Sequence, residues 1–353
     1  MNPFFAVVCL ILLTCVLLLL PLLPALAELH SKSDALPLSV IQQHTGEIRF
    51  FADGFRSYMK GLGPALRECV SSGTHATGTM PDGSEYLVLG RGAEALALPF
   101  REQNEFRPVM IASATDLLLP SETNFSKDIY SAASVIGSTK NRYRAILAEE
   151  DIRLGRESSV MRWVHAVGEF SADPGCRLYG RVSSDTGIRL SAECSFLRLN
   201  APYIAVGPEA DPARVFPEIP AGTTPQQRLF HDGDFEIRAG EVFQGNLVVR
   251  GRLRIGAGAR VRGSVKSEQE LALEPGASVE GSLISASTMQ IGFDCMIHGP
   301  VIAEHTALLQ KGTRCGTLQN PTTVSAPNIE VEEGVVVFGT LWAREQGQAV
   351  ASL

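Results

Sequence analysis

The sequence predicts a mainly β protein organised around a β-helix, a solenoid with about 18 residues per coil. Between Phe235 and Leu318, apolar residues recur every 18 positions in fixed columns. Such a repeat marks a solenoid. Three columns contain, respectively, Phe235, Leu253, Leu271 and Met289; Ile237, Ile255, Leu273, Ile291 and Leu309; and Phe243, Val261, Val279, Ile297 and Cys315.

The second observation is the pattern inside each repeat, where apolar residues alternate with others, as in Leu253 and Ile255. This is the periodicity of a strand with one face turned inward. Glycines between the short strands allow the backbone to turn a corner; the most regular column is Gly245, Gly263, Gly281 and Gly299. A single coil buries too little to be stable, so the coils must stack.

Residues 3–27 contain no charged side chain and are long enough to cross a bilayer as a helix. We expect a transmembrane anchor here. A secretory signal cleaved after Ala25-Leu26-Ala27 is the alternative, but no Lys or Arg precedes the apolar run.

Residues 28–125 are expected to form a juxtamembrane linker and a small α+β region. Its clearest element is an amphipathic helix from Gly46, with its apolar stripe at Ile48, Phe51, Phe55, Tyr58 and Leu62. That stripe predicts packing on the following domain, with a membrane-surface helix as the alternative.

The 18-residue spacing also occurs in residues 126–207, which predicts a first β-helical segment. Its columns include Ile152, Phe170 and Ile188, and Val160, Leu178 and Phe196. A proline-rich linker, residues 208–232, separates it from the main β-helix, residues 233–345. The sequence leaves open whether the two segments stack directly. Trp342 is a candidate cap of the last coil, and residues 346–353 are expected to be a disordered tail.

Composition and motifs argue against nucleic-acid binding, metal binding and catalysis. The net charge is −7 and no Lys/Arg-rich run is present, which disfavours nucleic-acid binding. No histidine has a metal-ligand spacing with another His or with Cys, and no catalytic grouping is discernible, so we expect no metal, no cofactor and no enzymatic activity. Cys176 and Cys194 fall on adjacent coils, close enough for a disulfide, although small buried fillers are the favoured reading.

The enzyme alternative is a hexapeptide-repeat acyltransferase, whose coil also has 18 residues. Those enzymes take a histidine base from an excursion loop, and the stretch from Pro208 to Arg228 contains no histidine, with His231 just beyond it.

Residues 233–345 resemble the bactofilins, the polymer-forming cytoskeletal proteins of bacteria. The resemblance rests on Gly245-Asn-Leu-Val-Val-Arg-Gly251, Arg252-Leu-Arg-Ile-Gly256, Val261-Arg-Gly-Ser-Val265 and Val279-Glu-Gly-Ser-Leu283. It implies a right-handed β-helix, nucleotide-free end-to-end polymerisation, and scaffolding at the cytoplasmic face of the membrane.

We therefore expect a structural scaffold, anchored in the bacterial inner membrane by one span, that self-associates through the ends of its β-helix. The body is expected in the cytoplasm, with the periplasm as the alternative. Expected partners are further copies, the membrane and envelope proteins; a non-polymerising binding module is the alternative function. The residues expected to build the stack and its assembly ends are Phe235, Ile237, Ile255, Val261, Leu273, Val279, Ile291, Ile297, Phe338 and Leu341.

Overall fold

The computed structural model describes residues 49–90, 101–102, 105–106, 110–213 and 228–352, with scattered positions between Leu10 and Leu20. The chain divides into two compact units, Met1–Gly46 and Glu47–Leu353. Most of the predicted anchor, residues 3–27, and the linker after it lie outside the described residues. Within the described part of the chain, no helix combines the length and the apolar character needed to cross a membrane.

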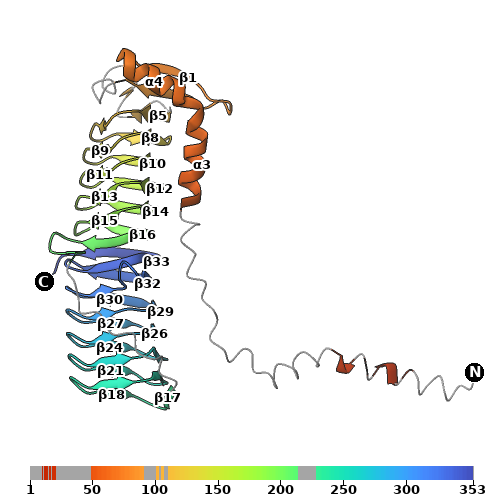
Figure 1. Ribbon diagram of the computed structural model, residues 1–353, viewed down its shortest axis with the longest axis vertical. Helices are drawn as coiled ribbons and strands as arrows, with labels where there is room; N and C mark the ends of the chain where they lie inside the picture. The colour runs from red at the N-terminus through yellow and green to blue at the C-terminus, as the bar shows by residue number, and fades with distance from the viewer. Residues whose placement is uncertain are drawn as a thin grey trace, which may run out of the picture. The chain divides into compact units, whose positions relative to one another are not determined.

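The second unit begins with two short helices and a hairpin (Figure 1). They are α3 (Phe50–Met59), the 3-10 turn η3 (Lys60–Leu62), α4 (Gly63–Ser72) and β1 (Ala76–Thr79), which pairs antiparallel with β2 (Glu85–Leu89). α3 is amphipathic, but its buried stripe differs from the predicted one: Phe55 and Met59 are buried, whereas Phe51 is 46% exposed. Phe55 and Met59 belong to a cluster with Val88, Met110 and Leu147, and the centres of the Phe55 and Trp163 rings are 5.5 Å apart, so α3 lies along the outer side of several successive coils.

The first β-helix follows, and its strands pair in parallel from coil to coil. One face, here called face 1, contains β2, β5 (Met110–Ser113), β8 (Ile129–Ser131), β10 (Arg142–Ala148), β12 (Ser159–Ala166), β14 (Arg177–Ser184) and β16 (Ser195–Val206). The others are β3 (Arg101–Glu102), β4 (Glu105–Phe106), β6 (Leu117–Leu119), β7 (Asn124–Phe125), β9 (Val135–Gly137), β11 (Ile152–Leu154), β13 (Glu169–Ala172) and β15 (Gly187–Leu190).

The second β-helix has three strands in each regular coil. Face 1 continues with β17 (Arg228–His231), β20 (Asn246–Val249), β23 (Val265–Ser267), β26 (Leu283–Ser285) and β29 (Val301–Ala303). The second face contains β18 (Phe235–Ile237), β21 (Leu253–Ile255), β24 (Leu271–Leu273), β27 (Met289–Ile291) and β30 (Thr306–Leu309). The third contains β19 (Val242–Gln244), β22 (Arg260–Arg262), β25 (Ser278–Val279), β28 (Met296–Ile297) and β31 (Arg314–Cys315), and the long strands β32 (Thr322–Glu332) and β33 (Val336–Val350) complete the stack.

The predicted coil of 18 residues is confirmed by the strand register. Leu253 pairs with Leu271, and Leu271 pairs with Met289, each a step of 18 positions. Ala307 pairs with Ile329, four positions beyond the regular step, so this coil is four residues longer than the others. The inward columns form a single apolar core that runs through both β-helices.

The strand ladder begins earlier than the first coil predicted from the sequence. Leu87 on β2 pairs with Ile111 on β5, which pairs with Ile129 on β8. Residues assigned to a separate α+β region therefore already stack on the β-helix. The repeat was not recognisable there because Leu87 and Ile111 are 24 positions apart, not 18.

The two β-helices join end to end through an antiparallel pairing of β16 with β33, here called the internal joint. Figure 1 shows the consequence: β16 and β33 lie side by side in the middle of the stack, while β17 and β18 lie at its far end. One ladder of paired residues consequently runs along face 1 through both segments. It contains Leu87, Ile111, Ile129, Ile146, Val164, Val182, Leu199, Leu341, Val324, Val301, Leu283, Val265, Leu247 and Leu229.

The prediction of a disordered tail after residue 345 was wrong. The last part of β33 pairs with β32, from Gln346 opposite Asn328 to Val350 opposite Glu332. Gly347 also lies opposite Phe196 of β16. The alternation of small and polar residues in this stretch is strand periodicity, and the backbone of Gly347 lies close to the ring of Phe196.

Candidate assembly surface

The far end of the second β-helix, formed by β17, β18 and β19, is an open end. Each of these strands pairs with one neighbour in the described part of the chain, β20, β21 and β22 respectively. An unpaired strand edge is a template for pairing with another chain. The first coil of the bactofilin-like repeat therefore presents backbone N–H and C=O groups along all three faces.

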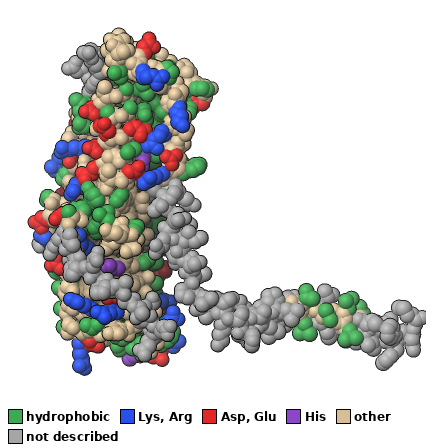
Figure 2. Space-filling model, viewed as in Figure 1, with side chains coloured by type: hydrophobic (Ala, Val, Ile, Leu, Met, Phe, Trp, Pro, Cys, Tyr) green, Lys and Arg blue, Asp and Glu red, His purple; other side chains and the backbone are tan. Residues whose placement is uncertain are grey.

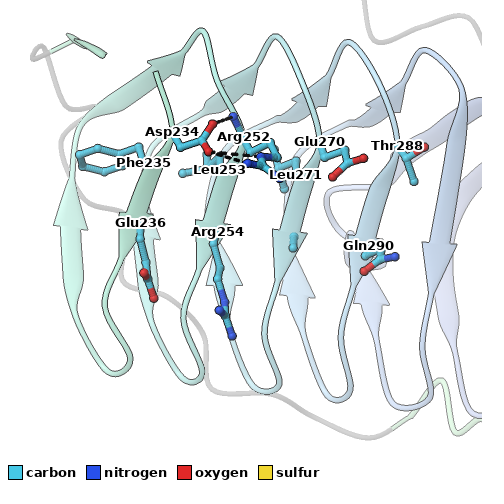
Figure 3. Close-up of a pocket in the computed structure, with 11 residues that line it drawn as sticks. Asp234, Phe235, Glu236, Arg252, Leu253, Arg254, Glu270, Leu271, Thr288 and Gln290 are labelled. Carbon is cyan, nitrogen blue, oxygen red and sulfur yellow. Dashed lines mark hydrogen bonds and ion pairs between the residues drawn. The ribbon is translucent and has the colours of Figure 1, made fainter. Parts of the chain in front are cut away.

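Each inward column ends here in an apolar side chain that nothing covers completely. On face 1, Leu229 is 43% exposed, whereas Leu247 one coil inside is fully buried. Phe235 and Phe243 end the other two columns and are half-buried against the core. Figure 3 shows Phe235 on the outermost coil, on the side away from Leu253 and Leu271. Within the part of the chain that the structure describes, no further layer covers the core at this end.

Further apolar side chains of the same coil face solvent. Phe230 is 68% exposed and Val242 is 49% exposed. The guanidinium carbon of Arg228 lies 5.8 Å from the centre of the Phe230 ring, and the His231 and Phe235 rings are 4.9 Å apart. Clustered apolar side chains beside open strand edges are typical of a protein–protein contact.

A charged ladder beside this end ties the outermost coil to the next. Asp234 accepts hydrogen bonds from the backbone N–H of Arg252, at 2.8 Å, and from its guanidinium, at 3.0 Å (Figure 3). These donors lower the pKa of Asp234. Arg254 likewise binds Glu274 at 3.0 Å. Asp234, Arg252 and Arg254 line a groove of about 650 Å³. Their ion pairs join neighbouring coils, so the groove fits a structural ladder.

The opposite end of the second β-helix is covered by the internal joint. Leu341 and Val337 are fully buried opposite Leu199 and Ile204. Phe338, predicted as a terminal assembly residue, is 5% exposed in a cluster with Ala205, Ala210 and Val336. The two predicted assembly ends are therefore unlike: Phe235 and Ile237 lie at the open end, while Phe338 and Leu341 lie inside the molecule.

The remaining predicted residues form the interior of the stack. Ile255, Val261, Leu273, Val279, Ile291 and Ile297 are buried at 3% exposure or less. These residues lie in the coils that follow the open coil in the stack and stabilise it by packing, and their side chains are buried. Sequence analysis missed Leu229, Phe230 and Val242, the first two because they lie in the stretch predicted as linker. The 18-residue spacing between Leu229 and Leu247 could have assigned Leu229 to the β-helix.

Trp342, the candidate cap, lies on the outer surface of the internal joint. The guanidinium carbon of Arg198 lies 5.1 Å from the centre of its ring, so the contact crosses from one β-helix to the other. A second groove, of about 550 Å³, runs along this side and includes Phe51, Tyr179 and Arg344. Figure 2 shows acidic and basic side chains interspersed over the visible face of the stack.

The five cysteines that the structure describes are buried thiols. Cys176 and Cys194 are free, as are Cys69, Cys295 and Cys315. The neighbouring Cys194 thiol and burial raise the pKa of Cys176, and burial raises the pKa of Cys295 to about 11. Neutral thiols are weak nucleophiles. Among the residues that the structure describes, no group of three or more His, Cys, Asp or Glu is placed to hold a metal ion.

Comparison with family models matches residues 236–341 to the bactofilins, described as polymer-forming cytoskeletal proteins. The matched segment runs from β18 in the outermost coil to Leu341 in β33 and leaves out β17, so most of the second β-helix matches a bactofilin domain, and the family is a structural one. Comparisons of the chain with curated proteins and with solved structures gave no match.

Proposed function

We propose that this chain is a structural scaffold protein that associates with further copies through the open end of its bactofilin domain. The observation that carries the proposal is the uncovered first coil, in which Leu229, Phe230 and Val242 are exposed beside three unpaired strand edges. The family description, polymer-forming cytoskeletal, supports the same function.

The physical basis is the incomplete core at this end. Burying an apolar side chain stabilises a contact by roughly 1.5–3 kcal/mol. A second coil stacked on β17–β19 covers Leu229, Phe235 and Phe243 and pairs their strand edges at the same time. Both contributions favour association at this end.

The proposal includes membrane anchoring by residues 3–27, with the body in the bacterial cytoplasm. It is supported by the absence of charged side chains from this stretch. Envelope proteins are the further partners that such a location suggests.

The test is the mass of the full chain in a mild non-ionic detergent, measured by light scattering after gel filtration. The wild-type chain is expected to associate, and the double variant Phe230→Asp/Val242→Asp is expected to give single copies, because two charges on the open end oppose its burial. Leu318→Asp is the matched control: Leu318 is 57% exposed and lies away from this end. Equal masses for wild type and double variant contradict the proposal.

A further inference from the structure

We infer that association through the open end stops at two copies, because the internal joint uses up the other end of the bactofilin domain. The inference rests on the proposed function and adds the identity and number of partners: one second copy of this chain. Three observations carry it, namely the covered joint, the covered start of the first β-helix, and the geometry of the joint itself.

The internal joint closes the end from which a bactofilin domain could otherwise grow. β33 has β32 on one side and β16 on the other, so its backbone is paired on both edges. The contact is also tightly packed, since a Cβ atom at Gly347 would lie 2.3 Å from the ring of Phe196. Backbone hydrogen bonds join Glu193 to Ala349 and Ala349 to Cys194, each at 2.8 Å. No second chain can enter here without displacing β16.

The start of the first β-helix is also covered. β1 lies antiparallel to β2 along its edge, α4 packs beside β2 through Leu66 and Cys69, and the inward Leu87 and Leu117 are at most 1% exposed. Gly90 lies so close to this cover that a Cβ atom would be 2.5 Å from the carbonyl oxygen of Cys69. Among the residues that the structure describes, the coil end with exposed inward side chains is therefore the one at β17–β19, and an end-to-end contact between two copies uses this end of each copy.

The internal joint shows the geometry of such a contact. Face 1 meets face 1, with Leu199 opposite Leu341, while Phe196 and Ile204 lie opposite Gly347 and Val337 on different faces. This is the pattern that a two-fold axis along the normal of face 1 produces. At the open end, the same two-fold rotation places β17 of one chain against β17 of the second chain. It places β18 of each chain against β19 of the other. The contact is antiparallel and self-complementary, which is the form of a closed dimer.

The first experiment measures stoichiometry and length for the full chain in a mild non-ionic detergent. Sedimentation velocity is expected to reach two copies and no larger species as concentration rises. A face-1 ladder of 14 strands per copy, spaced about 4.8 Å apart, predicts rods of uniform length near ~130 Å for two copies in electron micrographs. Filaments, or masses that keep growing, overturn the inference and leave the proposed function standing. Single copies overturn both.

The second experiment opens or locks the internal joint. Gly347→Leu places a side chain against the ring of Phe196 and is expected to free a second end, so that assemblies larger than two copies form. A folded Gly347→Leu chain that stays at two copies overturns the inference. Gly347→Leu can also unfold the chain by disrupting the packed core, so a second variant is used, Asn200→Cys/Thr340→Cys. The two residues lie opposite each other in the joint, and their side chains share a hydrogen bond of 2.8 Å.

The cysteine pair is expected to form a disulfide within one chain after mild oxidation, and to leave the two-copy mass unchanged. A disulfide-linked pair of chains on a non-reducing gel means that the joint forms between copies, and it overturns the inference.

Discussion

Leu273 and Ala272 are neighbours on β24 but meet opposite environments. Leu273 is 3% exposed within an inward column, between Ile255 and Ile291, while Ala272 points outward. Leu273→Asp buries an unpaired carboxylate in the middle of the stack. We expect the free energy of unfolding to fall by roughly 4 kcal/mol or more. Urea unfolding followed by circular dichroism measures it, with Ala272→Asp as the control; similar losses for both variants contradict the column assignment.

His165 couples the fold to pH. Its ring is buried, with Nδ1 at 2.9 Å from the Ser183 hydroxyl and Nε2 at 3.8 Å from Asp185, which also binds Arg49 of the α3 region. Burial is the largest influence and lowers the pKa of His165, with Arg56 and Arg49 acting in the same direction and Asp185 and Asp53 against it.

Because the folded state resists protonation of His165, the unfolded state binds the proton first as the pH falls. Stability is therefore full above the unfolded pKa of about 6.5 and declines below it, until the folded pKa is passed. Urea unfolding at pH 7.5 and 5.5 is expected to show this decline, and His165→Gln is expected to reduce it. An unchanged slope in the variant assigns the pH dependence to other groups, such as His298, whose pKa burial also lowers.

At the scale of elements, the sequence predicted those strands whose neighbours lie 18 positions away. β21, β24 and β27 have the expected bounds and register, because a fixed step places like residues on one another. Prediction was worse where coils differ in length. β2 and β5 were read as a separate region, and β17 as linker, although each belongs to the ladder.

The internal joint could not be predicted from the repeat. β16 and β33 are far apart in sequence, and their antiparallel pairing leaves no periodic signal. The outermost residues of a column also resemble those inside it: Leu199 and Leu229 are both ordinary column members. Only the structure shows that Leu199 is covered and Leu229 is not. For the same reason, Phe235 and Phe338 were predicted as equivalent ends.

At the scale of the whole molecule, stability should be graded along the stack, because each coil is supported by its neighbours only. Amide hydrogen exchange of the Phe230→Asp/Val242→Asp variant is expected to be fastest in β17–β19, which have one neighbour each, and slowest near β16 and β33. In the wild-type chain, association should slow exchange at β17–β19 by at least about ten-fold, since local opening then requires breaking the contact. Uniform exchange along the second β-helix contradicts this gradient.

The position of β33 also sets an order of events during synthesis. β16 ends at Val206, and the strand that covers its edge begins at Val336, 130 positions later. At about 5–20 residues per second, synthesis of these residues leaves that edge open for roughly 7–26 seconds. During this time the first β-helix has an unpaired strand edge at β16. Neighbouring nascent chains on the same messenger RNA present the same edge and can pair with it. Slowing translation between these two strands should lower the yield of correctly closed molecules and increase aggregation.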